Sequence, residues 1–150
     1  MLNSYQPAAK RTPSWQPDLI ALDANLLVRL LTNDDPRQSA KVEAWLKVNA
    51  SPKSPAYVDH IVLCELAWVL ERSYAYSRFQ VHTALAALLE QDHLRIESPG
   101  LVRQSLLKFA NGPPDFSDCL LAVRAHAAGY WPVLTFDTRA AKTDTHQLLR

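Results

Sequence analysis

Four acidic residues in separate parts of the sequence have the type and setting to do chemistry together. Asp23 and Asp137 each end a short apolar run, Asp118 stands near the start of an expected helix, and Glu65 lies inside the apolar stretch VLCELAWVL. Carboxylates that converge on one point repel one another, and a hard divalent cation with oxygen ligands relieves that repulsion. Water held by such an ion can attack a phosphodiester. The four acids therefore indicate metal-dependent phosphoryl transfer to water.

Each acid also has an ordinary explanation. Asp115 and Asp118 fall in a first helical turn, where carboxylates complement the helix dipole and cap free N–H groups. Glu65 is harder to explain, because a glutamate with only apolar near neighbours needs a partner such as a buried arginine, a hydroxyl or a metal ion. Spacing alone leaves the structural and the catalytic interpretation open.

The elements expected around these acids are short strands that alternate with helices. The runs that suit strands are 19–23, 56–59, 94–98 and 133–136. The residues that mark helix starts are Asp35 before Pro36, Asp59, Ser77 and Pro99. This alternation predicts the α/β class, with a parallel sheet covered by helices on both faces. Ligands of such sheets bind outside the carboxyl ends of the strands, where Asp23 and Asp137 would both project.

Composition limits the alternatives. The formal net charge of +1 means that binding to nucleic acid would depend on a local basic patch. Cys64 and Cys119 lack the spacing of a zinc site and are too few for a disulfide scaffold, which fits a reducing cytoplasm. No apolar run reaches the length of a membrane span. We expect residues 1–18, with three prolines and few aliphatic residues, to be a flexible extension ahead of one domain, 19–150.

Four stretches resemble the acidic motifs of the PIN-domain ribonucleases, in particular the VapC-like toxins of bacterial type II toxin–antitoxin pairs. In chain order they are ALDANLLVRLLTNDDP, VLCELAWVLERSYAYSR, PPDFSDCLLA and LTFDTRAAK. The likeness runs from Leu19 to the C-terminus and includes residues that flank the acids. It implies a three-layer α/β/α PIN-like domain with a central, short-stranded parallel sheet.

The resemblance also implies roles for single residues. The catalytic and metal-binding acids would be Asp23, Glu65, Asp118 and Asp137, with Mg²⁺ or Mn²⁺ as the cofactor. The supporting residues would be Asp115, Asn25 and Thr135, of which Thr135 would contact the phosphate or hold Asp137. Ala24 and Pro114 depart from the family pattern without removing a ligand. The basic residues close in sequence to the acids are candidates for holding RNA phosphates, and these are Arg29, Arg124, Arg139 and Lys142.

We therefore expect a metal-dependent endoribonuclease that acts in the cytoplasm on RNA, is inhibited by a cognate antitoxin and forms a homodimer. The resemblance implies that the antitoxin binds in a helical groove. Core packing and such a groove both explain the aromatic residues in this region, which are Trp45, Trp68, Tyr74, Tyr76 and Phe79.

Two other function classes compete with the nuclease. The first is a non-catalytic PIN-like domain that binds RNA or protein, although its acids would then have little reason to gather at one edge. The second is a small phosphatase or nucleotide-binding protein. None of the three glycines lies in a phosphate-cradling loop, and the LDAN motif lacks the second aspartate that a phosphatase needs.

Overall fold

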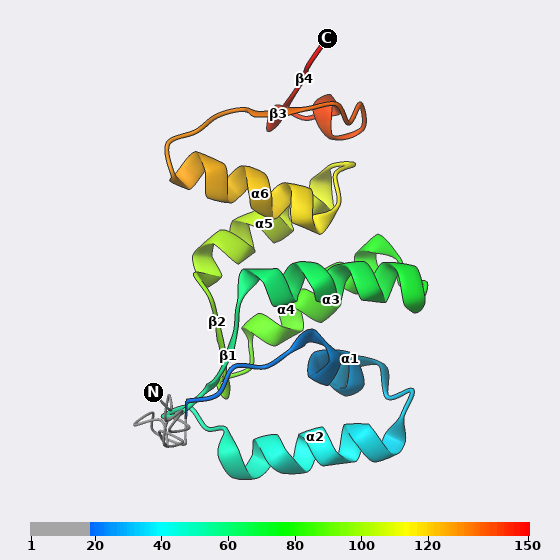
Figure 1. The fold of residues 1–150 in the computed structure, drawn as a ribbon, viewed down its shortest axis with the longest axis vertical. Coiled ribbons are helices and arrows are strands. Elements are labelled where there is room, and N and C mark those ends of the chain that lie inside the picture. Colours follow the sequence, from blue (N-terminus) through cyan, green and yellow to red (C-terminus); the bar gives the residue numbers. More distant parts are fainter. Residues whose placement is uncertain (1–18) are drawn as a thin grey trace, which may run out of the picture.

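The structure is a computed structural model that describes residues 19–150. The extension expected at residues 1–18 therefore lies outside the described residues. The described elements in chain order are α1 (Ala24–Thr32), α2 (Pro36–Asn49), β1 (Ala56–Val58), α3 (His60–Ser73), α4 (Arg78–Leu89), β2 (Leu94–Ile96), α5 (Pro99–Asn111), α6 (Phe116–Ala127), β3 (Val133–Thr135), the 3₁₀ turn η1 (Ala140–Lys142) and β4 (His146–Leu148) (Figure 1).

Capping residues fix the starts of three helices where the sequence predicted them. The carboxylate of Asp35 accepts a hydrogen bond from the N–H of Gln38 at 3.1 Å, directly ahead of the proline that opens α2. Asp59 caps α3 in the same way, and Ser77 opens α4 as part of a capping box. Because each cap satisfies an N–H group that the first helical turn leaves free, the local sequence decides where these helices begin.

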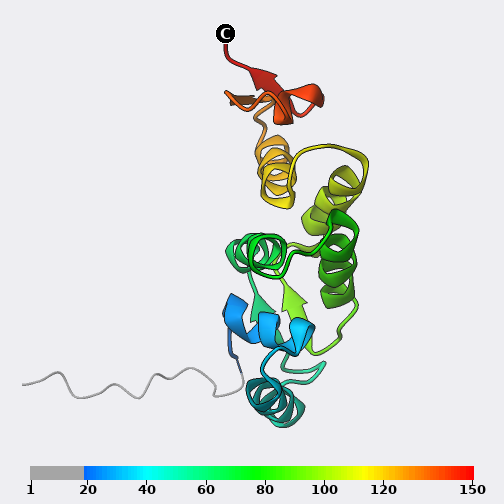
Figure 2. The ribbon, with the colours of Figure 1, turned by 90° about the vertical axis from the view of Figure 1, so that its right-hand side faces the viewer.

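The strands form two separate parallel pairs. β1 pairs with β2, with Ala56 opposite Leu94, and β3 pairs with β4, with Val133 opposite His146. Short parallel strands among helices confirm the predicted α/β class. The two pairs lie toward opposite ends of the elongated molecule, with α3, α5 and α6 between them (Figures 1 and 2).

The first expected strand is reduced to a single bridge. Ala21 is bridged to Tyr57, with hydrogen bonds from the N–H of Leu22 to the Tyr57 oxygen and from the N–H of Tyr57 to the Ile20 oxygen, both 2.8 Å long. Leu22 is buried, but Leu19 is 63% exposed. The prediction of a strand buried on both faces is therefore wrong. In the described chain, β1 is the only strand that pairs with this segment.

The strand expected at 133–136 also differs from the prediction. β3 forms, but Leu134 is 59% exposed and Phe136 is 78% exposed, so it is not a buried strand. β3 is exposed because in the described chain it pairs with one strand, β4. Neither β4 nor the turn η1 was predicted from the sequence.

The core is built by the helices around β1 and β2. Phe109 on α5 meets Phe116 on α6 in an edge-to-face contact with ring centroids 6.2 Å apart, which joins the last two helices. α3 lies between α1 and α6 in both views (Figures 1 and 2). Among the described helices, none combines the length and apolar character required to cross a membrane.

Candidate functional site

Two carboxylates stand together at the start of α6. Asp115 is the N-cap, and its carboxylate accepts hydrogen bonds from the N–H of Asp118 and from the hydroxyl of Ser117, each at 3.2 Å. Asp118 follows in the first turn, while Cys119 turns into the core and is buried. The alternation of acidic and apolar residues thus gives the first turn of α6 one polar face and one core face.

The electrostatic environment of this turn is unusual. Burial raises the pKa of Asp118 to about 7, and a side-chain hydrogen bond with Asp115 and the negative charges of Asp115 and Asp137 act in the same direction. Burial also favours a higher pKa for Asp115, but hydrogen bonds from Asp118 and Ser117 outweigh it and the net shift is downward. Near neutral pH the carboxyl of Asp118 is therefore partly protonated and donates to the Asp115 carboxylate in that state. The positive charge of Arg139 opposes part of this effect.

Asp137 lies in the turn that follows β3. Its carboxylate accepts hydrogen bonds from the N–H groups of Arg139 at 2.8 Å and Ala140 at 3.2 Å, which start η1. Its own N–H donates to the hydroxyl of Thr135 at 3.0 Å. Thr135 thus contacts Asp137, which is one of the two roles that the resemblance implied for it.

Asp23 and Glu65 come from other elements, the cap of α1 and the middle of α3. Asp23 precedes α1, and its carboxylate accepts a hydrogen bond from the N–H of Ala24 at 2.7 Å. Asn25, in the first turn of α1, is exposed. Glu65 is also exposed, on a face of α3 that includes Ile61, 73% exposed. The expectation that Glu65 is buried among apolar neighbours is wrong, because this face of α3 is not covered.

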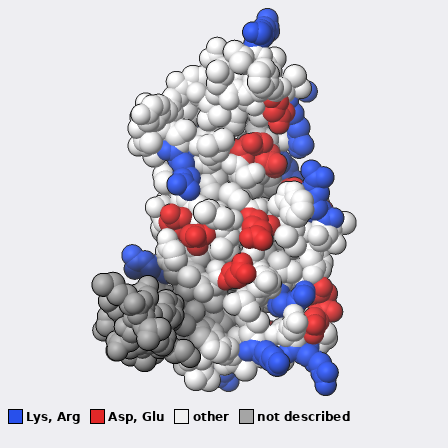
Figure 3. Space-filling view, in the orientation of Figure 1, with Lys and Arg blue, Asp and Glu red and all other residues white. Residues whose placement is uncertain are grey.

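The donor chemistry fits a hard cation, although a single described chain does not assemble the full set. Within residues 19–150, no three His, Cys, Asp or Glu side chains lie close enough to hold one metal ion. The acids themselves offer only carboxylate oxygens, the ligands that Mg²⁺ and Mn²⁺ prefer. The pKa of Asp118 is raised first by burial, and the negative charges of Asp115 and Asp137 add to this shift. On the face drawn in Figure 3, acidic side chains gather across the middle and many of the Lys and Arg side chains lie toward the edges.

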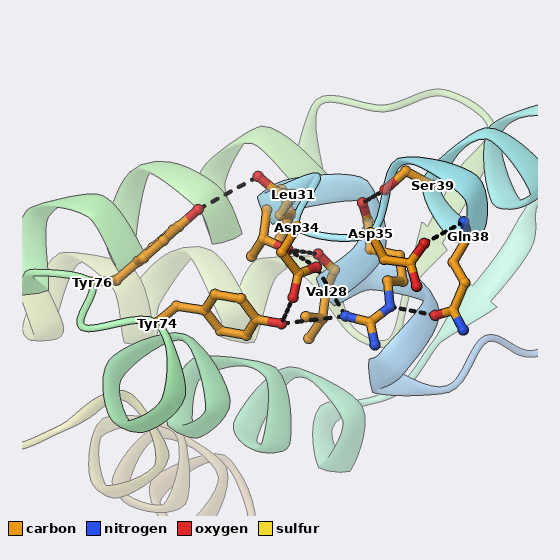
Figure 4. Close-up of polar contacts among 10 residues, drawn as sticks. Val28, Leu31, Asp34, Asp35, Gln38, Ser39, Tyr74 and Tyr76 are labelled. Carbon is orange, nitrogen blue, oxygen red and sulfur yellow. Dashed lines mark hydrogen bonds and ion pairs between the residues drawn. The ribbon is translucent and has the colours of Figure 1, made fainter.

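The four basic residues proposed to hold RNA phosphates differ in whether their side chains already bind other residues. Arg29 is already engaged, because its guanidinium donates to Asp34 at 2.9 Å, to Gln38 at 2.5 Å and to the hydroxyl of Tyr74 at 3.3 Å (Figure 4). The other three are exposed and form no ion pair with any residue that the structure describes, and these are Arg124, Arg139 and Lys142.

One positioning residue was not predicted. The guanidinium of Arg78, at the start of α4, donates hydrogen bonds to the carbonyl oxygens of Gly112 and Pro114 and lies over the ring of Phe109, 4.2 Å from its centroid. These contacts hold the loop that leads into the acidic turn of α6. No sequence signal marks this role, because Arg78 simply follows a helix cap and its partners lie more than thirty residues away.

Comparisons with known proteins find matches over the part of the chain that contains these acids. A sequence model of the PIN domain matches residues 20–145, a range that contains all the acids described above. The chain is 22% identical over 121 residues to a VapC ribonuclease of Aquifex aeolicus (strain VF5), and the match covers 81% of this chain and 89% of that protein. The helices and short parallel strands are consistent with the three-layer α/β/α architecture of the resemblance. With the family model spanning most of the chain and the acids in the expected order, this protein belongs to the PIN-domain family.

Proposed function

We propose that this protein is a metal-dependent endoribonuclease that hydrolyses RNA phosphodiester bonds, and that it is the toxin of a toxin–antitoxin pair. The observation that carries the proposal is the acidic first turn of α6, where Asp118 is hydrogen-bonded to its N-cap Asp115 and feels the charge of Asp137. Three carboxylates that influence one another in this way cost stability unless they serve a ligand. The similarity to a VapC ribonuclease supports RNA as the substrate class and an antitoxin as a partner.

The acidic residues would have separate roles in this reaction. Asp118 and Asp137, with Asp23 and Glu65, would hold Mg²⁺ or Mn²⁺, and the bound ion would supply an activated water and neutralise charge on the phosphate. Asp115 orients the backbone of Asp118 through the cap hydrogen bond.

Backbone and basic side chains would position the RNA. Thr135 and η1 fix the turn in which Asp137 sits. Arg139 and Lys142 are exposed on the same turn and carry the charge needed to hold phosphates. Because such contacts release counterions from RNA, its binding would weaken as salt is added.

The aromatic residues support a protein partner in part. Phe79 and Trp68 are 78% and 57% exposed, which core packing does not explain. Tyr74 and Tyr76 are half-buried and hydrogen-bonded to Asp34 and to the Leu31 oxygen, so these two have structural roles. We propose the exposed rings as the contact surface for the antitoxin. A homodimer and a cytoplasmic location, where both free cysteines stay reduced, complete the proposal.

The test is cleavage of a pooled small-RNA substrate by purified, antitoxin-free protein with Mg²⁺ or Mn²⁺. We expect cleavage to disappear with EDTA and in Asp118→Asn. The matched control is Asp92→Asn, which changes a 79%-exposed acid outside the site and should cleave as the wild type does. RNA binding without cleavage in well-folded wild type would refute the enzyme and favour the non-catalytic PIN-like domain.

A further inference from the structure

Two exposed aromatic side chains, Tyr130 and Trp131, lie just after the end of α6 and have no part in the proposed reaction. The side chain of Tyr130 is 74% exposed and that of Trp131 is 44% exposed, although the two are neighbours in the chain. Single exposed apolar side chains are ordinary, whereas Tyr and Trp exposed together are typical of contact surfaces. We call these two residues the aromatic pair.

The backbone at the end of α6 fixes the position of Tyr130. The N–H of Gly129, whose φ is 91°, donates a hydrogen bond to the His126 oxygen at 3.0 Å. The N–H of Tyr130 donates to the Ala125 oxygen at 2.9 Å. Together these bonds form a Schellman motif, in which the residue at the position of Tyr130 commonly packs back on its helix. Because the ring of Tyr130 is in solvent instead, core packing does not explain it.

Two side-chain contacts fix the ring of Trp131. It meets the ring of His126 nearly at a right angle, with the centroids 4.9 Å apart. The ammonium nitrogen of Lys108, on α5, lies over the Trp131 ring, 6.0 Å from its centroid. The aromatic pair is therefore ordered as well as accessible, and a ring that is already ordered loses little freedom when a ligand binds.

The charge around the aromatic pair is positive. Arg124 and His126 lie in the last turn of α6, and Lys108 approaches from α5, whereas the carboxylates of α6 stand at its opposite end. One acid, Asp144, lines the same small cavity as Lys108 and offsets part of this charge. The helix dipole accounts for basic residues in a last helical turn, but not for Lys108 or for the exposed rings. Aromatic rings among cations are the usual surface for single-stranded nucleic acid, because bases stack on the rings and phosphates pair with the cations.

We propose that the aromatic pair is a second contact for RNA, on which an unpaired base stacks while Lys108 attracts a phosphate of the same strand. The choice of RNA as the ligand rests on the proposed nuclease function. α6 has 12 residues, so the aromatic pair lies about 18 Å along the helix from the acids of its first turn (Figure 1). A single strand cut at the acids would reach the pair with a base a few nucleotides away. The contact would therefore favour RNA that is unpaired beside the cleaved bond over a duplex, whose bases are not free to stack.

The first test measures binding without cleavage. The probe is a fluorescein-labelled oligouridylate of about 12 nucleotides, followed by fluorescence anisotropy with EDTA present. We expect Tyr130→Ala to raise the dissociation constant at least about fivefold, and Tyr130→Phe, which keeps the ring, to bind as the wild type does. Tyr130→Leu keeps apolar bulk without an aromatic face and should bind as weakly as Tyr130→Ala. The matched control is Val48→Ala, which shortens an 83%-exposed side chain on α2 and should have no effect.

Three results of this measurement would overturn the proposal. They are equal affinity of the wild type and Tyr130→Ala, full affinity of Tyr130→Leu, and no binding by the wild type. Salt dependence tests the part assigned to charge. Lys108→Ala should lower the slope of log affinity against log salt by about 0.7, whereas Tyr130→Ala should leave the slope unchanged. An unchanged slope in Lys108→Ala would remove Lys108 from the contact.

The fluorescence of Trp131 tests where the base binds. The oligouridylate should quench tryptophan emission of the wild type more than that of Trp131→Phe, and equal quenching would overturn the proposal by placing the base elsewhere. A blue shift with vesicles of anionic phospholipid, without quenching by RNA, would overturn it in favour of a membrane surface. RNA that binds through the aromatic pair but is never cleaved with Mg²⁺ or Mn²⁺ would refute the nuclease and leave the contact standing. Cleavage by the wild type together with full RNA affinity of Tyr130→Ala would overturn the contact alone.

Discussion

Replacing Asp118 by Asn should make the protein more stable while it removes activity. The pKa of Asp118 is raised from 3.8 to about 7 by burial, by its hydrogen bond with Asp115 and by nearby negative charge. The folded state therefore binds a proton that the unfolded state has lost, and stability falls as pH rises from the unfolded pKa through about 7. The side-chain amide of Asn can still donate a hydrogen bond to Asp115 but carries no charge, so the stability of the variant does not fall as pH rises in this range.

The gain in unfolding free energy can be worked out from the shift in the pKa of Asp118. About three pKa units at about 1.4 kcal/mol each would be about 4 kcal/mol for a fully enclosed group. Asp118 is only half-buried, and solvent screening reduces the expected gain in unfolding free energy to about 1–2 kcal/mol above pH 7. Below the unfolded pKa of Asp118 the gain should vanish, because both states are then protonated.

Urea denaturation with EDTA present, at about pH 8 and about pH 3, measures this directly. Asp92→Asn is the control, since its carboxylate is 79% exposed. Equal stability of wild type and Asp118→Asn at both pH values, or a variant that is less stable at the higher pH, would refute the reasoning. Added Mg²⁺ should stabilise the wild type more than the variant, because a ligand stabilises only the state that binds it.

Two further predictions concern contacts away from the acids. Arg78→Ala removes the hydrogen bonds to the carbonyl oxygens of Gly112 and Pro114. We expect urea denaturation to show that the free energy of unfolding falls by about 2–3 kcal/mol. A fall of less than about 0.5 kcal/mol would contradict this role of Arg78. Tyr74→Phe removes the 2.5 Å hydrogen bond that chiefly lowers the pKa of Asp34. Its melting temperature should fall at neutral pH, and the fall should disappear as pH drops through the lowered folded-state pKa of that carboxyl. An equal fall at neutral pH and at a pH below that pKa would contradict this account.

The helix starts that the sequence predicted correctly are those set by contacts between residues close together in the chain. Asp35, Asp59 and Ser77 cap the helices that they were expected to cap, since each bond joins residues three apart. β3 was placed correctly, whereas residues 19–23 form a single bridge in place of the expected strand. Both were expected to be buried, because an apolar run does not reveal whether another strand lies beside it. β4 is three residues long and two of them are polar, so it shows no periodic pattern in the sequence; it pairs with β3, about a dozen residues earlier.

The candidate site shows the same limit. The acids of α6 and Asp137 in the turn after β3 come near one another because residues 133–150 pack against the loop before α6, with Thr143 beside Gly112. Glu65 was expected to need a buried partner, but α3 has apolar residues on every side and the sequence does not state which side is covered. The relative placement of Asp23 and Asp118 depends on how whole elements pack, and no motif encodes that.

The strand edges have a consequence at high protein concentration. In the described chain, residues 20–22, β2, β3 and β4 each pair with a strand on one side only. The apolar side chains of Leu134 and Phe136 are exposed beside one of these edges. Edges with unpaired backbone groups and apolar side chains add strands from other chains, so association should increase with protein concentration.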